Sequence, residues 1–247
     1  MKANINDITP SNPLSSNADK LYGTKSSSFP QKLSMQAMSW MAVVLAAWLV
    51  LGGTSTVAAY LGWSVKEVAT PERAFLIILC SSIYAARVLF TQFFLIKRNM
   101  PWTEAITVGL WIIIIHTTFA VLGGVNGQPL SWLSWFGVGL YVVGSYLNTG
   151  SELRRHFWKK NPANKGRLYT EGLFACAMHI NYFGDFTLFM GFSLVTGMVW
   201  TMVIPMLMAG MFVFVNIPML DTYLAKRYAG QFEKYATSTK KFIPFIY

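Results

Sequence analysis

The stretch "MHINYFGD", residues 178–185, places four polar side chains between two apolar runs: His179, Asn181, Tyr182 and Asp185. Asn181 and Asp185 are four residues apart, so a helix would put them on one face. A carboxylate in the middle of a membrane span costs about 2.5–3.5 kcal/mol, and such residues usually face a bundle interior or a wet cavity. The pair is therefore either a polar clamp between helices or a ligand-binding pair, and we predict the second.

Other polar side chains also lie inside apolar runs, namely Arg87, Gln92 and His116. Arg87 could form a structural ion pair, reach the headgroups, or act on a substrate or cofactor. His116 and His179 could each serve in structural hydrogen bonding or contact a ligand. His179 lies about 200° from Asn181 around a continuous helix, so the two cannot share a face there. Few carboxylates lie near these histidines, and we expect no metal site.

The segment 146–172 combines six Lys and Arg residues with asparagines and two acids. Asn148, Glu152 and Arg155 have helical spacing and would share one face, before "NPANKG" breaks the helix. Arg and Lys bind phosphates, while Asn and carboxylates bind ribose hydroxyls and adenine amines. The cations could also be only a signal of membrane topology. We predict that the segment, Arg167 included, binds a nucleotide.

The chain that positions these residues has the composition of an integral membrane protein. Of 247 residues, 54% are hydrophobic and 12% are charged, against about 25% charged in soluble domains. The net charge of +10 comes from cations at the ends of apolar runs, which favours lipid headgroups and anionic cofactors over nucleic acid. Cys80 and Cys176 both lie in apolar segments and are expected to be small packing residues.

Six segments are apolar and long enough to suggest an all-α, polytopic membrane bundle. They are 36–61, 74–96, 104–123, 131–147, 173–196 and 198–219. Gly197 would supply the tight turn between the last two. Residues 1–30 are polar and are expected to be a disordered tail, leaving 31–247 as one membrane domain. Leu224, Tyr228, Phe232 and Tyr235 predict an amphipathic helix after the last span.

The charges between these spans predict an orientation. Seventeen of the twenty Lys and Arg residues lie in the tail and in alternate loops, and only Lys66 and Arg73 lie in loops on the opposite side. The positive-inside rule therefore places both termini in the cytoplasm, and we expect a bacterial inner membrane. No obligatory protein partner is evident.

Residues 146–247 resemble a known family. "GRLYTEGLFACAMHINYFGD" through "YLAKRYAGQFEKYATSTKKFIPFIY" resembles the C-terminal domain of steroid 5-alpha-reductase-like proteins, and within them the bacterial group DUF1295. The resemblance implies an NADPH-dependent reductase whose cofactor lies among the last helices and their cytoplasmic loops. Asn148 and Glu152, Asn181 and Asp185, and Tyr228 match its cofactor contacts, and Arg155 and Arg167 fall close to its basic positions. The glutamate and tyrosine that act in catalysis there, on the second and third spans, are not matched, and Arg87 and His116 are the candidates in their place.

We therefore predict reduction of an activated C=C bond in a steroid-, sterol- or isoprenoid-like substrate, with Arg87 or His116 stabilising the enolate or delivering a proton. The predicted cofactor-binding residues are Asn148, Glu152, Arg155, Arg167, His179, Asn181, Tyr182, Asp185 and Tyr228. The alternative is an S-adenosylmethionine-dependent lipid or isoprenylcysteine-type methyltransferase. Those enzymes share this C-terminal architecture, but their "RHPxYxG" motif is only partly present here. A further alternative is a membrane protein without enzymatic activity.

Overall fold

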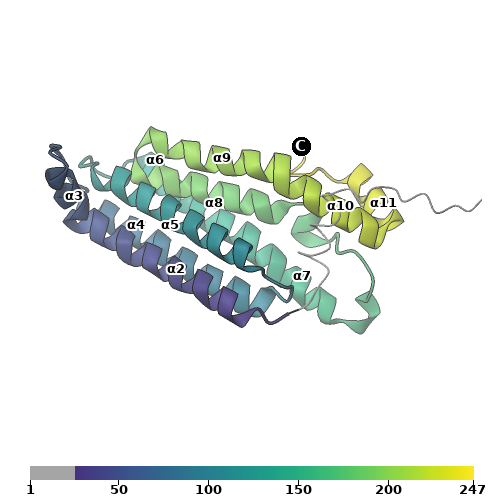
Figure 1. The fold of residues 1–247 in the computed structure, drawn as a ribbon. Helices are drawn as coiled ribbons and strands as arrows, with labels where there is room; N and C mark the ends of the chain where they lie inside the picture. The colour runs from purple at the N-terminus through teal and green to yellow at the C-terminus, as the bar shows by residue number, and fades with distance from the viewer. Residues whose placement is uncertain (1–25) are drawn as a thin grey trace, which may run out of the picture.

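The computed structural model describes residues 26–247, and within that range it is helical, with no strand. The expected all-α fold with membrane-spanning helices is confirmed. The disordered tail expected over residues 1–30 lies mostly outside the described residues, and the first helix already begins at Phe29. In Figure 1 the long helices run side by side in one bundle, with α7, α10 and α11 at one end of it.

Four helical runs are long and apolar enough to cross a membrane: Phe29–Tyr60, Pro71–Leu95, Trp102–Gly124 and Val199–Tyr228. The first contains α2 (Phe29–Trp48), η2 (Leu49–Gly53) and α3 (Thr54–Tyr60), and the second contains α4 (Pro71–Phe90) and η3 (Thr91–Leu95). The third is α5 (Trp102–Gly124), and the fourth contains η7 (Val199–Met202), α9 (Val203–Met211), η8 (Phe212–Asn216) and α10 (Ile217–Tyr228). These runs correspond to the first three and the last of the six expected spans.

The fourth and fifth expected spans correspond to shorter helices. One is α6 (Trp132–Ser145), which continues through η4 (Tyr146–Gly150) into α7 (Ser151–Lys160). The other is α8 (Ile180–Thr196), with 17 residues, which begins later than position 173 because a short 3-10 turn, η6 (Gly172–Ala175), and an irregular link precede it. Both fall below the length of about 20 residues that a span normally needs. The count of six spans therefore stays a prediction.

Glycines bring α6 and α8 unusually close together. Gly137 and Gly144 on α6 face Gly191 and Gly184 on α8. A Cβ atom at Gly144 would lie 2.3 Å from the backbone nitrogen of Leu188, and one at Gly184 would lie 2.4 Å from that of Asn148. Small residues of this kind allow helix backbones to touch within a membrane. The glycine pairs thus hold Asn148 against the first turns of α8.

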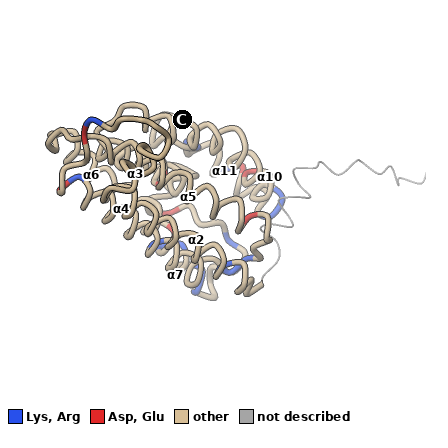
Figure 2. The backbone as a smooth tube through the Cα atoms, turned by 60° about the vertical axis from the view of Figure 1, so that its left-hand side comes forward, with Lys and Arg blue, Asp and Glu red and all other residues tan. Residues whose placement is uncertain are grey.

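The turns that close the bundle include the two that the sequence indicates. Gly197 ends α8 with a φ of 69°, in the left-handed region that favours glycine. At the other end, α7 stops at Lys160, before the short turn η5 (Pro162–Asn164). Figure 2 shows most Lys and Arg residues at the end of the bundle with α7, α10 and α11.

The C-terminal amphipathic helix differs from the expectation, because it is two helices. The last apolar run continues into α10, and α11 (Gly230–Ser238) follows a break at Ala229, whose φ is 40°. The expected apolar face is still present, since Leu224 and Tyr228 pack with Phe232 and Tyr235 around Met178. The break lets α11 fold back onto the start of the fifth predicted span instead of continuing the direction of α10.

Candidate functional site

Arg87 lies at the centre of a polar cluster formed by three helical segments. From α4, its Nη2 donates to Asn148 Oδ1 at 2.7 Å and lies 3.4 Å from Asp185 Oδ1 on α8. Its Nε donates to Thr149 Oγ1 at 2.9 Å. We call Arg87, Asn148, Thr149 and Asp185 the Arg87 cluster. The ion pair neutralises the costly carboxylate of Asp185, as the polar-clamp alternative requires.

The Arg87 cluster also borders a cavity of about 150 Å³, which we call the inner cavity. The cavity is lined by Met35, Tyr84, Arg87, Val88, Thr91, Gln92, Ile96, Asn148 and Asp185. Gln92 is only 1% exposed, yet neither its amide nitrogen nor its amide oxygen has a hydrogen-bond partner. A buried amide left unpaired is costly, so its two atoms are available to a ligand. This inner cavity is smaller than a typical ligand pocket of about 300–1,000 Å³, and it could hold a single functional group.

Two π-helical turns position the polar residues of this cavity. Gln92 lies in η3, at the end of the second apolar run, and Asn148 and Thr149 lie in η4, between α6 and α7. A π turn accommodates an additional residue in a helix and is frequent at functional sites. Asn148 also uses its Nδ2 to donate to the backbone oxygen of Asn181 at 3.0 Å. The structure therefore brings Asn148, Asn181 and Asp185 together, as the sequence indicates.

Glu152 and Arg155 form an ion pair on α7, in agreement with their predicted common face. Glu152 Oε2 accepts from Arg155 Nη2, whereas Glu152 Oε1 is buried without a partner. The guanidinium of Arg155 lies 5.3 Å from the ring centre of Phe174. A buried carboxylate oxygen without a partner is costly, so Glu152 Oε1 is available to a hydrogen-bond donor of a ligand.

Arg167 and Tyr228 lie further out. Arg167 Nη1 donates to Asn164 Oδ1 at 3.4 Å, and its guanidinium lies 5.9 Å from the ring centre of Trp158. The ring of Tyr228, at the end of α10, lies 5.8 Å from the guanidinium of Arg227. Both residues are at the end of the bundle predicted to be cytoplasmic, and their proposed cofactor contacts stay predictions.

His179 and Tyr182 make interhelical contacts different from those of the Arg87 cluster. His179 is just outside α8, one of the two positions foreseen, and its Nε2 lies 2.8 Å from Asp221 Oδ1 on α10. Asp221 Oδ2 accepts from Lys241 Nζ at 2.9 Å. The ring of Tyr182 stacks on Phe212, with ring centres 4.8 Å apart. These contacts agree with the structural alternative for His179, because they tie α8 to α10 and to the C-terminal segment.

The second catalytic candidate, His116, is buried among aromatic rings. Its Nδ1 lies 2.9 Å from Ser81 Oγ, and its Nε2 has no partner. Its ring centre lies 5.0 Å from that of Tyr84, and Tyr84 in turn lies 5.7 Å from the guanidinium of Arg87. Arg87 therefore lines the inner cavity, whereas His116 lies behind Tyr84. Sequence reasoning named Gln92 without selecting it and missed Thr149, which only its position beside Asn148 could have indicated.

Comparison with known proteins places the chain in a family. The profile of DUF1295, described as "Protein of unknown function (DUF1295)", matches residues 105–239. A curated protein of Ustilaginoidea virens, "Probable O-methyltransferase ustE", is 34% identical over an alignment of 168 residues that covers 62% of this chain. The match spans 58% of the length of that relative. Because the family profile covers more than half of the chain, the protein belongs to the DUF1295 family.

Proposed function

We propose that this protein is a membrane-embedded O-methyltransferase that uses S-adenosylmethionine to methylate a hydroxyl group of a lipophilic molecule. The observation that carries the proposal is the 34% identity to a probable O-methyltransferase, which extends over more than half of both chains. It favours the methyltransferase alternative of the sequence over the NADPH reductase. The departures from "RHPxYxG" then concern the details of cofactor binding rather than the reaction class.

The charges of the candidate site fit this cofactor. S-adenosylmethionine has a cationic sulfonium and an ammonium group, and the unpartnered Oε1 of Glu152 is an acceptor for a cation. Asn148 and Asn181 would hydrogen-bond to its adenosine. Arg87 and Arg155 are already paired with Asp185 and Glu152. These pairs leave less positive charge for the pyrophosphate and 2′-phosphate of NADPH.

The inner cavity fits the acceptor end of the substrate. When bound, S-adenosylmethionine supplies an electrophilic methyl group and leaves as a neutral thioether. The acceptor oxygen must lose its proton as it takes the methyl group, and the carboxylate of Asp185 would receive that proton. Gln92, with both amide atoms unpaired, would orient the hydroxyl group. The lipophilic remainder would lie between the early helices.

A binding experiment tests this proposal. Purified protein in lipid nanodiscs is titrated with S-adenosylmethionine, S-adenosylhomocysteine and NADPH by calorimetry. We expect the first two to bind and the Glu152→Gln variant to bind S-adenosylmethionine about tenfold more weakly, since about 1.4 kcal/mol of charge interaction is lost. Glu233→Gln, which removes an exposed carboxylate on α11, is the matched control. If neither S-adenosylmethionine nor its product binds, the proposal is wrong.

The second candidate, an NADPH-dependent reductase, has support from the "NYFGD" and "IPFIY" segments and from the six cations of 146–172. The same titration separates the two functions, because NADPH alone would bind under this candidate. For the transferase, radioactive methyl groups should pass from the cofactor into a lipid extract. Asp185→Asn should abolish that transfer while leaving S-adenosylmethionine binding intact.

A further inference from the structure

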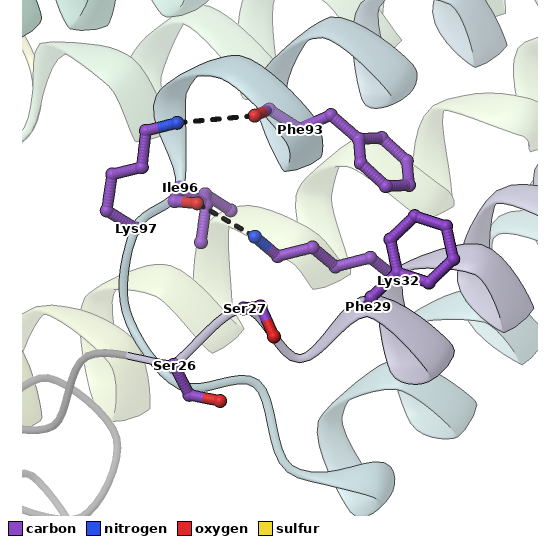
Figure 3. Close-up of a pocket in the computed structure, with 7 residues that line it drawn as sticks. All are labelled: Ser26, Ser27, Phe29, Lys32, Phe93, Ile96 and Lys97. Carbon is purple, nitrogen blue, oxygen red and sulfur yellow. Dashed lines mark hydrogen bonds between the residues drawn. The ribbon is translucent and has the colours of Figure 1, made fainter.

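A second cavity, of about 500 Å³, lies next to the inner cavity and is not part of the proposed methyl-transfer site. It is lined by Ser26, Ser27, Phe29, Lys32, Phe93, Ile96 and Lys97. Figure 3 shows these residues on the segment that leads into α2, on the start of α2, and at the end of the second apolar run and just beyond it. Ile96 lines both cavities, so they are neighbours along η3. We call it the outer cavity.

Two ammonium groups of the outer cavity are not matched by acids. Lys32 is 5% exposed, and its Nζ donates to the backbone oxygen of Ile96 at 2.9 Å. Lys97 Nζ donates to the backbone oxygen of Phe93 at 3.4 Å (Figure 3). An ammonium has three donors, so each can make further hydrogen bonds. Among the described residues that line the cavity there is no Asp or Glu.

A neighbouring cation shows how unusual this arrangement is. Arg98, next in the chain to Lys97, forms a bidentate ion pair with Glu104, at 2.7 and 2.5 Å. The fold therefore neutralises the adjacent guanidinium with a carboxylate but gives Lys32 only a carbonyl. A buried ammonium without a counter-charge is costly. An anion that enters the outer cavity would remove that cost.

The remaining walls of the outer cavity fit a lipid. Phe29 and Phe93 meet edge to face, with ring centres 5.9 Å apart, and Phe29 is 57% exposed. The two lysines belong to the end of the bundle that the positive-inside rule places at the cytoplasmic surface, where anionic phospholipids are concentrated. Ser26 and Ser27 add hydroxyl groups to the polar side of the cavity. The cavity thus combines cations and hydroxyls with exposed aromatic rings at a membrane boundary.

We propose that the outer cavity binds the phosphate of an anionic phospholipid, between Lys32 and Lys97, with the glycerol and the first acyl carbons against Phe29 and Phe93. The lipid bound there would close the outer cavity and supply the counter-charge that the protein lacks. The proposal does not depend on the methyltransferase function, because it concerns residues outside the Arg87 cluster.

To test this, short-chain phosphatidylglycerol, short-chain phosphatidylcholine and inorganic phosphate are each titrated separately into the full chain solubilised in detergent. Binding is followed by native mass spectrometry and by thermal shift. We expect phosphatidylglycerol to bind at least tenfold more tightly than the other two. The Lys32→Gln/Lys97→Gln variant should bind it about 25-fold more weakly, at about fivefold for each lost charge. Lys234→Gln/Lys240→Gln, which removes two exposed charges from the same end of the molecule, should bind normally.

Three results would overturn the proposal: equal binding of phosphatidylglycerol and phosphatidylcholine, full binding by the Lys32/Lys97 variant, or equal weakening by the control variant. Inorganic phosphate that binds as tightly as phosphatidylglycerol would also contradict it, because the site would then take a free anion. If the double variant does not fold, Lys97→Gln alone removes an exposed charge and should weaken phosphatidylglycerol binding about fivefold. Unchanged binding by that single variant would equally contradict the proposal.

Discussion

The close approach of α6 and α8 predicts a large effect from one methyl group. In Gly144→Ala, the new Cβ would lie 2.3 Å from Leu188 N and 2.6 Å from Gly184 O, both backbone atoms. Ordinary contacts begin near 3.4 Å, so the two helices must separate by about 1 Å. Overpacking of this kind costs about 1–3 kcal/mol. We expect the upper part of that range, because backbone atoms cannot move aside as a side chain can.

The same helix provides a matched control. A Cβ atom at Gly139, on α6, would meet nothing within 4 Å. Gly139→Ala should therefore be neutral or stabilising by up to about 1 kcal/mol, because alanine loses less conformational entropy in a helix. Thermal unfolding in detergent should show Gly144→Ala melting about 5–10 °C below the parent.

Ligand binding provides a second readout of the same change. Separation of α6 from α8 would lengthen the 3.0 Å hydrogen bond from Asn148 Nδ2 to the backbone oxygen of Asn181. S-adenosylmethionine should therefore bind more weakly to Gly144→Ala than to Gly139→Ala. Equal melting temperatures for the two variants would refute the argument, because the backbones would then not be in contact.

Two further predictions concern the ends of the bundle. Arg73→Met should destabilise the protein by about 2–4 kcal/mol in detergent unfolding. Buried Arg73 donates to the backbone oxygens of Val195 and Gln128 at 2.7 and 2.9 Å, and the substitution would leave both oxygens unpaired. An unchanged melting temperature would contradict this prediction. Burial raises the pKa of Tyr235, whose hydroxyl donates to Phe174 O, above its ordinary value near 10. The stability that this raised pKa contributes is fully present below pH 10 and is lost as the pH rises beyond it. Melting temperatures measured from pH 8 to 11 should therefore fall less steeply for Tyr235→Phe than for the parent protein. Parallel curves for the two proteins would contradict this prediction.

Local patterns were sufficient for much of the fold. Apolar runs predicted the helical membrane bundle, and Gly197 predicted the turn after α8 because few other residues adopt its φ of 69°. The spacing of Glu152 and Arg155 predicted that they share a helix face, and in the structure they form an ion pair there, since residues three apart are neighbours on a helix. The break at Ala229 was not foreseen, because alanine rarely takes a positive φ and the apolar spacing continues across it.

Contacts over long sequence distances were beyond the reach of local patterns. Arg87 and Asp185 were each recognised as costly, but nothing in the sequence joins positions that are 98 residues apart. The π turns were also missed, and they place Gln92 at the inner cavity and Thr149 beside Arg87. An extra residue in one helical turn leaves no periodic mark in so short a segment, which is why the predicted site lacked these two residues.

Variants of the ion pair between Arg87 and Asp185 can show whether the pair is only a polar clamp or is part of an active site. Removing one partner, as in Arg87→Met, should destabilise the protein by about 3 kcal/mol, because Asp185 is left as a buried charge. Replacing both, in Arg87→Met/Asp185→Leu, should restore most of that stability. If the pair is only a clamp, methyl transfer returns together with stability. If Asp185 receives the substrate proton, the double variant folds and stays inactive, and a folded double variant with full activity would remove the Arg87 cluster from the catalytic site.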